Sequence, residues 1–162
     1  MRTLYLLRHA KSSWHDETLS DFDRPLKKRG RDAAKLVGEL VRKEKLSDIL
    51  VVSSPAQRTR ETTRIVLKHA KLDPEVRFDP QIYEAELSAL LEMLGRIESD
   101  HECVMIVGHN PGMENLLRLL TGASREMPTA ALAKIKLDTA SWNSLSGNDG
   151  HLEWIKTQRE DD

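Results

Sequence analysis

Residues 3–14 read TLYLLRHAKSSW, and this stretch decides the fold. The apolar run Leu4–Leu7 has the length and composition of a short buried β-strand. It stops abruptly at Arg8 and His9, two side chains that are costly to bury and well suited to holding an anion. A buried strand that ends in such a pair predicts a polar site at the carboxyl end of a sheet.

Further along the chain, strand-like apolar runs alternate with segments of helical periodicity. This alternation predicts a three-layer α/β/α sandwich with a central, mostly parallel sheet. Two late segments, joined by the Ser/Asn/Gly-rich stretch SLSGNDG, predict a hairpin added to that sheet. The expected strands are 3–7, 48–54, 76–78, 103–107, 131–137 and 151–155, and the expected helices are 29–45, 55–70, 86–97 and 111–122.

Two local details follow from helix rules. In the first helix, Ala33, Leu36, Val37, Leu40 and Val41 recur at helical spacing with charged residues between them. The second helix is expected to begin at its proline, residue 55, with the preceding serine as its cap.

Length and composition limit the class of protein. The chain has 162 residues, which suits a single domain, 1–162, with a polar tail from about residue 156. The net charge of −1 gives no electrostatic reason to expect nucleic acid or a membrane surface as partner. The single cysteine, Cys103, excludes an intramolecular disulfide and is expected to be a small buried hydrophobe. No secretory leader or membrane-spanning run is evident, so a soluble, cytoplasmic protein is expected.

Polar side chains follow several of the predicted strands. Arg8 and His9 follow the first strand, and Arg58 lies just beyond the second. His109 follows the 103–107 strand, and Glu84 lies a little beyond the weak 76–78 strand. Because ligands bind beyond the carboxyl ends of parallel strands, these five side chains are expected to converge at one edge of the sheet.

This combination of residue types suits phosphoryl transfer. Arginine binds phosphate oxygens through paired hydrogen bonds, and a neutral imidazole can attack phosphorus. A second imidazole, once protonated, can neutralise charge in the transition state, and a carboxylic acid can protonate the leaving group. Asp21 and Asp23, in DFDRP, are an alternative Mg²⁺ pair or a surface loop, but no metalloprotease or paired Cys/His pattern accompanies them. No glycine-rich nucleotide loop is present.

Several motifs, in order, resemble those of the histidine phosphatase superfamily, which has a phosphoglycerate-mutase-like fold. They are LLRHA, PLKKRG, SSPAQRTRETT and VGHNPG. RHAKSSW, DFDRPLKKRG, IYEA and MPTAALA are similar to the SixA-type phosphohistidine phosphatase branch. The resemblance extends from Thr3 to about Ile155.

The resemblance implies a role for each of the five residues. His9 would be the nucleophile and form a phosphohistidine enzyme intermediate. Arg8, Arg58 and His109 would bind the phosphate, and Glu84 would occupy the position of the proton donor. No metal and no organic cofactor are implied.

Two departures from the family pattern bear on the substrate. Ala10 replaces the common glycine, which separates the chain from mutase-like members. The short segments between motifs leave little room for a lid, so an open, shallow site is expected. Such a site suits phosphohistidine on a signalling or phosphotransfer protein, such as a histidine-phosphotransfer domain, acted on by a monomeric enzyme.

Other interpretations remain open at this stage. A phosphomonoesterase acting on a small-molecule or Ser/Thr/Tyr phosphate is the main alternative. A mutase would need to enclose its intermediate against water, and a non-catalytic phosphate-binding module would not need the full residue set. Trp14 and Trp142 are expected to pack in the core or at the rim. Residues Met127–Ala133 either line the pocket or simply enter a strand.

Overall fold

The central feature of the fold is one mixed β-sheet. The computed structural model describes residues 1–158, and within them six strands lie in the order β3-β2-β4-β1-β5-β6. β3, β2, β4 and β1 are parallel, whereas β5 runs antiparallel to β1 and β6 antiparallel to β5. The predicted mostly parallel sheet with an added hairpin is therefore confirmed. The strands are β1 Arg2–Arg8, β2 Leu50–Ser53, β3 Glu75–Phe78, β4 Cys103–Gly108, β5 Leu132–Leu137 and β6 Gly150–Lys156.

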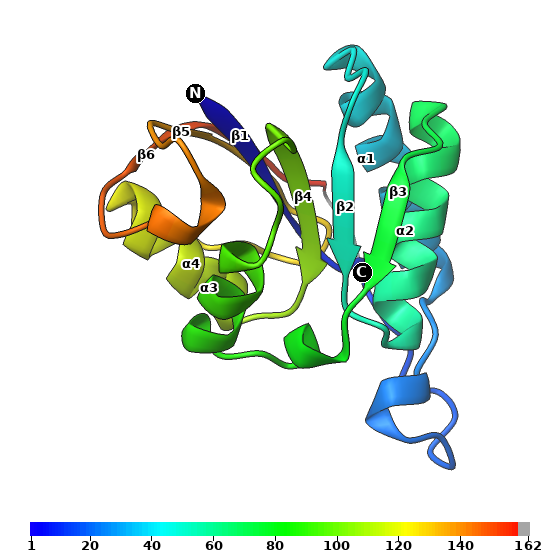
Figure 1. Ribbon diagram of the computed structural model, residues 1–162. Coiled ribbons are helices and arrows are strands. Elements are labelled where there is room, and N and C mark those ends of the chain that lie inside the picture. Colours follow the sequence, from blue (N-terminus) through cyan, green and yellow to red (C-terminus); the bar gives the residue numbers. More distant parts are fainter. Residues whose placement is uncertain (159–162) are drawn as a thin grey trace.

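Helices cover both faces of the sheet (Figure 1). On one face, α1 (Lys28–Lys43) packs beside α2 (Gln57–Ala70), and on the other α3 (Leu87–Gly95) packs beside α4 (Gly112–Thr121). Alternate residues of β1 enter different cores: Leu4 and Leu6 pack toward α3 and α4, and Tyr5 and Leu7 toward α1 and α2. The predicted three-layer α/β/α architecture is confirmed.

Packing against α2 decides which residues of α1 are buried. Leu36 is 46% exposed, and Ala34 and Gly38 are buried instead. The reason is the close approach of α2, because a Cβ on Gly38 would lie 2.6 Å from the Cβ of His69. Small residues therefore occupy the contact line, and the bulkier Leu36 faces outward.

The start of α2 differs from the prediction. The helix begins at Gln57 with Ala56 as its N-cap, and no side chain caps it. Ser54 and Pro55 instead extend the chain from the end of β2 toward the edge of the sheet. This places the hydroxyl of Ser54 among the polar residues of the site.

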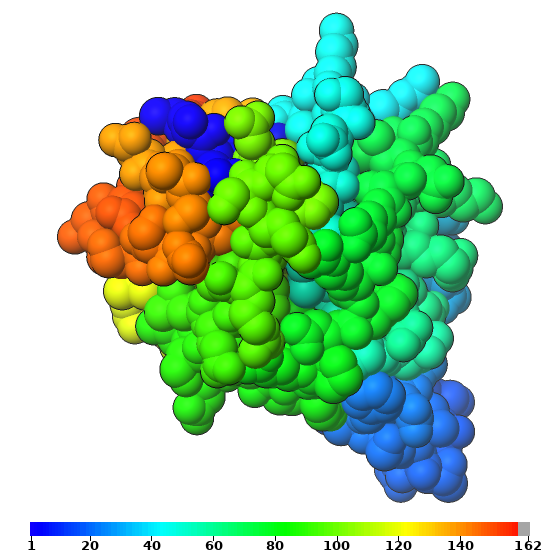
Figure 2. Space-filling view, in the orientation of Figure 1, coloured from blue at the N-terminus to red at the C-terminus, as the bar shows by residue number. Residues whose placement is uncertain are grey.

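A loop between β1 and α1, residues 12–25, projects from the body of the molecule and appears as the blue lobe in Figure 2. An antiparallel bridge between Ser12 and Leu26 closes its base. The loop contains the short 3₁₀-helix η1 (Asp21–Asp23). Two further 3₁₀-helices are η2 (Pro80–Ile82) and η3 (Trp142–Ser144).

The remaining sequence expectations have mixed outcomes. Trp142 is buried in the core, which is one of the two locations predicted for it. Cys103 is a free thiol that is only partly buried. β6 continues to Lys156, close to the residue at which the polar tail is predicted to begin, and residues 159–162 lie outside the described part. Among residues 1–158, no helix is long and apolar enough to cross a membrane. The cytoplasmic location stays a prediction.

Candidate active site

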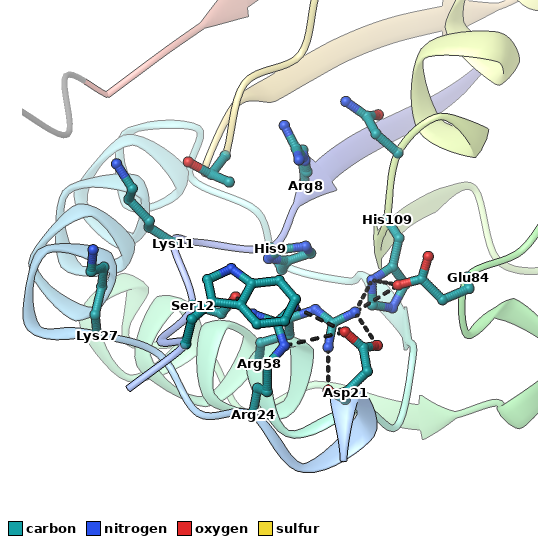
Figure 3. Close-up of a pocket in the computed structure, with 13 residues that line it drawn as sticks. Arg8, His9, Lys11, Ser12, Asp21, Arg24, Lys27, Arg58, Glu84 and His109 are labelled. Atoms are coloured by element: carbon teal, nitrogen blue, oxygen red, sulfur yellow. Dashed lines mark hydrogen bonds and ion pairs between the residues drawn. The ribbon is translucent and has the colours of Figure 1, made fainter. Parts of the chain in front are cut away.

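The sheet topology brings the two predicted histidines together. β1 and β4 are adjacent and parallel, with Arg8 opposite Gly108 in the register. The residues that follow are His9 and His109, and their ring centroids lie 5.2 Å apart. Arg58, from the first turn of α2, and Glu84, which follows η2, approach the same point (Figure 3). All five predicted residues therefore meet in one place.

These residues line a surface cavity of about 370 Å³ at the carboxyl ends of the parallel strands. The cavity is mostly cationic, with two carboxylates and one tryptophan in its walls. Its thirteen lining residues are Arg8, His9, Lys11, Ser12, Trp14, Asp21, Arg24, Lys27, Arg58, Glu84, His109, Asn110 and Thr129.

His9 has the properties of a nucleophile. It is 8% exposed, and burial, together with the charges of Arg58 and Arg8, lowers its pKa from 6.5 to about 4. The ring is therefore neutral near pH 7. Its Nδ1 lies 2.8 Å from the carbonyl oxygen of Ala10 and donates to it, which leaves the lone pair on Nε2.

His109 is also neutral in the free protein, because burial, the neighbouring His9 and Arg58 lower its pKa to about 3. Its Nδ1 accepts a hydrogen bond of 3.4 Å from Nη2 of Arg58. This contact assigns the ring proton to Nε2, which donates to Oγ of Ser54 at 2.8 Å. Ser54 therefore belongs to the site, although the sequence predicts it only as a helix cap.

Arg58 is the most buried cation of the site, with a side chain only 2% exposed. Its Nη1 donates to the carbonyl oxygen of Asp21 at 2.7 Å, and its Nη2 lies 3.0 Å from Oδ2 of Asp21 and 2.6 Å from Oε1 of Glu84. Its Nε is buried without a hydrogen-bond partner among the described residues. A buried donor without a partner is costly, so the Arg58 guanidinium retains unused hydrogen-bonding capacity beside the cavity.

Arg8 is positioned by the segment that precedes β5. Its Nη1 donates to the carbonyl oxygen of Met127 at 3.1 Å, and Nδ2 of Asn110 donates to the same oxygen at 2.9 Å. The carboxylate of Glu114 accepts from Nδ2 of Asn110 and from the backbone N–H of Met127. Thr129 lies in the cavity wall. The 127–133 segment therefore both lines the pocket and leads into the strand.

Glu84 sits at the edge of the cavity. Its Oε1 is 3.5 Å from Nδ1 of His109, and its side chain is 48% exposed. Its backbone has a φ of 51°, a conformation that is uncommon for a residue with a side chain. Such strained positions concentrate at functional sites.

The sequence alone does not decide the role of Asp21, and the structure places its side chain in the cavity wall. Its Oδ2 accepts hydrogen bonds from Arg58 and, at 2.5 Å, from the hydroxyl of Tyr83, and its Oδ1 accepts from Arg24. Partial burial would raise its pKa, but these donors hold it at about 2. Both oxygens are thus engaged by cations and a phenol, while Oδ2 of Asp23 accepts from the hydroxyl of Ser20. Within residues 1–158, no cluster of three or more His, Cys, Asp or Glu side chains is placed to hold a metal ion.

Comparison with known families identifies this arrangement. Residues 4–94 match the model of the histidine phosphatase superfamily, branch 1. The chain belongs to this superfamily, and the phosphatase class predicted from the sequence is confirmed. An Arabidopsis thaliana protein, named as chloroplastic and uncharacterized, is 36% identical over 161 residues, which cover 92% of this chain and 74% of that protein. A Mycobacterium tuberculosis protein, also named as uncharacterized, is 29% identical and covers 81% of this chain and 87% of its own length.

Solved structures show the same fold. A protein from Agrobacterium tumefaciens, described as a candidate phosphohistidine phosphatase SixA, superposes with a TM-score of 0.82 at 26% identity, covering 97% of this chain and 98% of its own. A SixA protein histidine phosphatase in complex with tungstate gives a TM-score of 0.80 at 22% identity, covering 94% and 95%. The phosphoglycerate-mutase-like fold is thereby confirmed, as is the predicted similarity to SixA proteins.

Proposed function

We propose that this phosphatase removes the phosphoryl group from phosphohistidine on a protein, with His9 as the nucleophile and without a metal or organic cofactor. The observation that carries the proposal is the state of His9. It is a buried, neutral imidazole whose Nδ1 is hydrogen-bonded to the Ala10 carbonyl, and it shares its cavity with Arg8 and Arg58. A candidate nucleophile and two guanidinium groups suited to phosphate thus line the same cavity.

In the first step, Nε2 of His9 attacks phosphorus and the bond from phosphorus to the leaving group breaks. Arg8 and Arg58 bind the phosphoryl oxygens, where charge is spread in the transition state. His109 is neutral in the free enzyme, and a phosphoryl dianion beside it raises its pKa and favours the protonated ring. The leaving group takes a proton as it departs.

In the second step, water attacks the phosphorus of phosphorylated His9. The P–N bond breaks, the electron pair returns to Nε2, phosphate is released, and the water loses a proton to a base. Glu84 is the carboxyl group at the cavity edge that is placed to give the first proton and take the second.

Leaving-group chemistry favours phosphohistidine as the substrate. Imidazole has a pKa of about 6.5, so it leaves readily once protonated. An alkoxide leaving group depends far more on a strong general acid, and Glu84 is half exposed and paired with Arg58. The names of the SixA structures that resemble the chain support the same substrate class. A phosphomonoesterase acting on small-molecule or Ser/Thr/Tyr phosphates is the alternative. A glucosyl-3-phosphoglycerate phosphatase has the same fold, so the fold is compatible with this alternative.

The test compares wild-type protein with His9→Ala after treatment with EDTA. Phosphate release is followed from a phosphohistidine protein, p-nitrophenyl phosphate, and sugar and glycerate phosphates. We expect preference for phosphohistidine, insensitivity to EDTA, and an acid-labile phosphoenzyme that His9→Ala abolishes. His151→Ala, an exposed histidine on β6, is the matched control and should leave activity unchanged. Activity on small esters alone would overturn the substrate, and activity that survives His9→Ala would overturn the mechanism.

A further inference from the structure

The indole of Trp14 is unusually placed for a tryptophan. It is 73% exposed, and yet it lines the cavity that holds His9 and Arg58. Exposed tryptophan surface at a binding pocket is a common recognition feature, because the ring offers a large, rigid apolar face. Every other side chain in the cavity wall is charged, polar or an imidazole. Among the described residues that line the cavity, Trp14 therefore supplies the one extended apolar surface.

A fixed cation supports the ring from one side. The guanidinium carbon of Arg24 lies 3.4 Å from the centroid of the indole, within the range of a cation–π contact. Arg24 is itself 7% exposed, and its Nη1 donates to Oγ of Ser12 at 2.8 Å. Its Nε and Nη2 both donate to Oδ1 of Asp21, at 3.2 and 3.0 Å. These hydrogen bonds hold Arg24 in place against one face of the indole.

The carboxylate of Asp21 connects Arg24 to the proposed phosphate site. Oδ1 of Asp21 binds Arg24, and Oδ2 binds Arg58 (Figure 3). The position of the indole is therefore coupled to that of the phosphate-binding arginine through one bridging side chain. A phosphoryl group occupies only part of a cavity of about 370 Å³, and the rest is open to whatever is attached to it.

We propose that Trp14, backed by Arg24, is a leaving-group platform: a binding surface for planar aromatic or heteroaromatic groups attached to the phosphoryl group. The assignment rests on the proposed phosphatase function and specifies its substrate class. The imidazole of phosphohistidine and the ring of an aryl phosphate would stack on the open face of the indole. A leaving imidazole that becomes protonated would gain a further cation–π attraction. Alkyl groups, such as glycerol, would gain little from this surface.

The first test measures binding, so that it does not depend on turnover. Phenylphosphonate and methylphosphonate present the same anionic group with and without a planar ring. Calorimetric titration of the wild-type protein should show tighter binding of the phenyl compound. Trp14→Leu should reduce that preference about 3–10-fold, as expected for loss of an aromatic pair, and Trp14→Phe should retain most of it. Methylphosphonate should bind all three proteins equally.

The second test measures kcat/KM for a phosphohistidine protein, p-nitrophenyl phosphate and glycerol phosphate. Trp14→Leu should lower the value for the first two substrates about 3–10-fold and leave the third unchanged. Phe78→Leu is the matched control, since Phe78 is 40% exposed beneath Arg60, at 4.2 Å, and does not line the cavity. It should change none of the three values.

Two outcomes would overturn the platform: equal affinities of Trp14→Leu and wild type for phenylphosphonate, or an equal loss on all substrates and both phosphonates. An equal loss would mean that the tryptophan only holds the loop in place. Failure of the proposed function looks different. In that case the wild-type protein would not act on phosphohistidine, while the two phosphonates would still report whether the platform exists.

Discussion

Asp21 and Arg58, separated by 37 residues in the chain, are joined by two contacts: Nη1 of Arg58 donates to the backbone carbonyl of Asp21, and Nη2 lies 3.0 Å from its Oδ2. The 12–25 loop thus contributes a carboxylate to the cavity that holds Arg58. In the proposed reaction, an incoming phosphoryl dianion would share Arg58 with this carboxylate and with that of Glu84. The two carboxylates would then limit how tightly the phosphate product is held and favour its release.

Asp21→Asn should therefore tighten the binding of inorganic phosphate. The amide keeps an oxygen that can accept from Tyr83 and Arg58 but removes a negative charge near the bound dianion. A like charge about 4 Å away costs about 1 kcal/mol even at the dielectric constant of bulk water, so the inhibition constant of phosphate should fall at least about 5-fold. Asp23→Asn is the control in the same 3₁₀-helix, and it should leave the constant unchanged. An inhibition constant that rises in Asp21→Asn would show that the carboxylate mainly orients Arg58.

The two histidines predict an unusual titration. Burial lowers the pKa of His9 to about 4 and that of His109 to about 3, so both rings should stay neutral in the free protein well below pH 6. NMR titration of the imidazole Cε1 protons, assigned with His9→Ala and His109→Ala, measures this directly. A saturating phosphate analogue such as tungstate should move the midpoint of His109 upward. Midpoints near 6.5 in the free protein would contradict the neutral nucleophile.

The same shifts predict how stability depends on pH. The unfolded chain takes up protons on both imidazoles as the pH falls through 6.5, whereas in the folded protein His9 stays neutral to about pH 4 and His109 to about pH 3. Stability should therefore be greatest above pH 6.5 and fall as the pH decreases from 6.5 through these two values, by about 1.4 kcal/mol for each pKa unit of difference. Urea unfolding at pH 7 and pH 5 measures the effect, and it should shrink in His109→Ala. An unchanged pH dependence in that variant would exclude His109 as a source.

Much of the fold and of the site was predictable because both depend on local patterns. Apolar runs that end in polar residues located Arg8, His9 and His109, and the rule that parallel strands share an edge brought them together. Helix periodicity alone does not decide whether Leu36 is buried, because the packing of α2 against Gly38 determines which face of α1 is buried. That packing is a tertiary contact, which no single segment encodes.

The unpredicted part of the site comes from residues whose partners are distant in sequence. Asp21 lies in a loop, and its contacts with Arg58 and Tyr83, 37 and 62 residues away, distinguish it from Asp23. The sequence predicts Ser54 as a helix cap, but its hydroxyl is hydrogen-bonded to Nε2 of His109, 55 residues away. For Trp14 the sequence predicts only packing in the core or at the rim, and its contact with Arg24 at the cavity depends on a residue ten positions away in a loop.

Glu84→Gln should separate substrates by their leaving groups. If Glu84 supplies the proton, its loss should cost about 10²–10⁴-fold in kcat for alkyl phosphates, which release a poor leaving group. Phosphohistidine should be hydrolysed at nearly the wild-type rate, because imidazole is a good leaving group once protonated. Steady-state rates on a phosphohistidine protein and on glycerol phosphate test this. An equal loss on both substrates would mean that Glu84 acts by holding Arg58.

Gly112→Ala should displace Glu84, the proposed proton donor, without changing its side chain. A Cβ on Gly112 would lie 2.3 Å from the carbonyl oxygen of Ala85, so the backbone next to Glu84 must move. Overpacking of this kind costs about 1–3 kcal/mol of stability, measurable by urea unfolding. The variant should also lose alkyl phosphate turnover more than phosphohistidine turnover, as Glu84→Gln does. Gly95→Ala is the control, because its Cβ would meet nothing closer than 3.8 Å, and it should change neither property. Uniform loss on both substrates in Gly112→Ala would show that α4 supports the phosphate site as a whole rather than the position of Glu84.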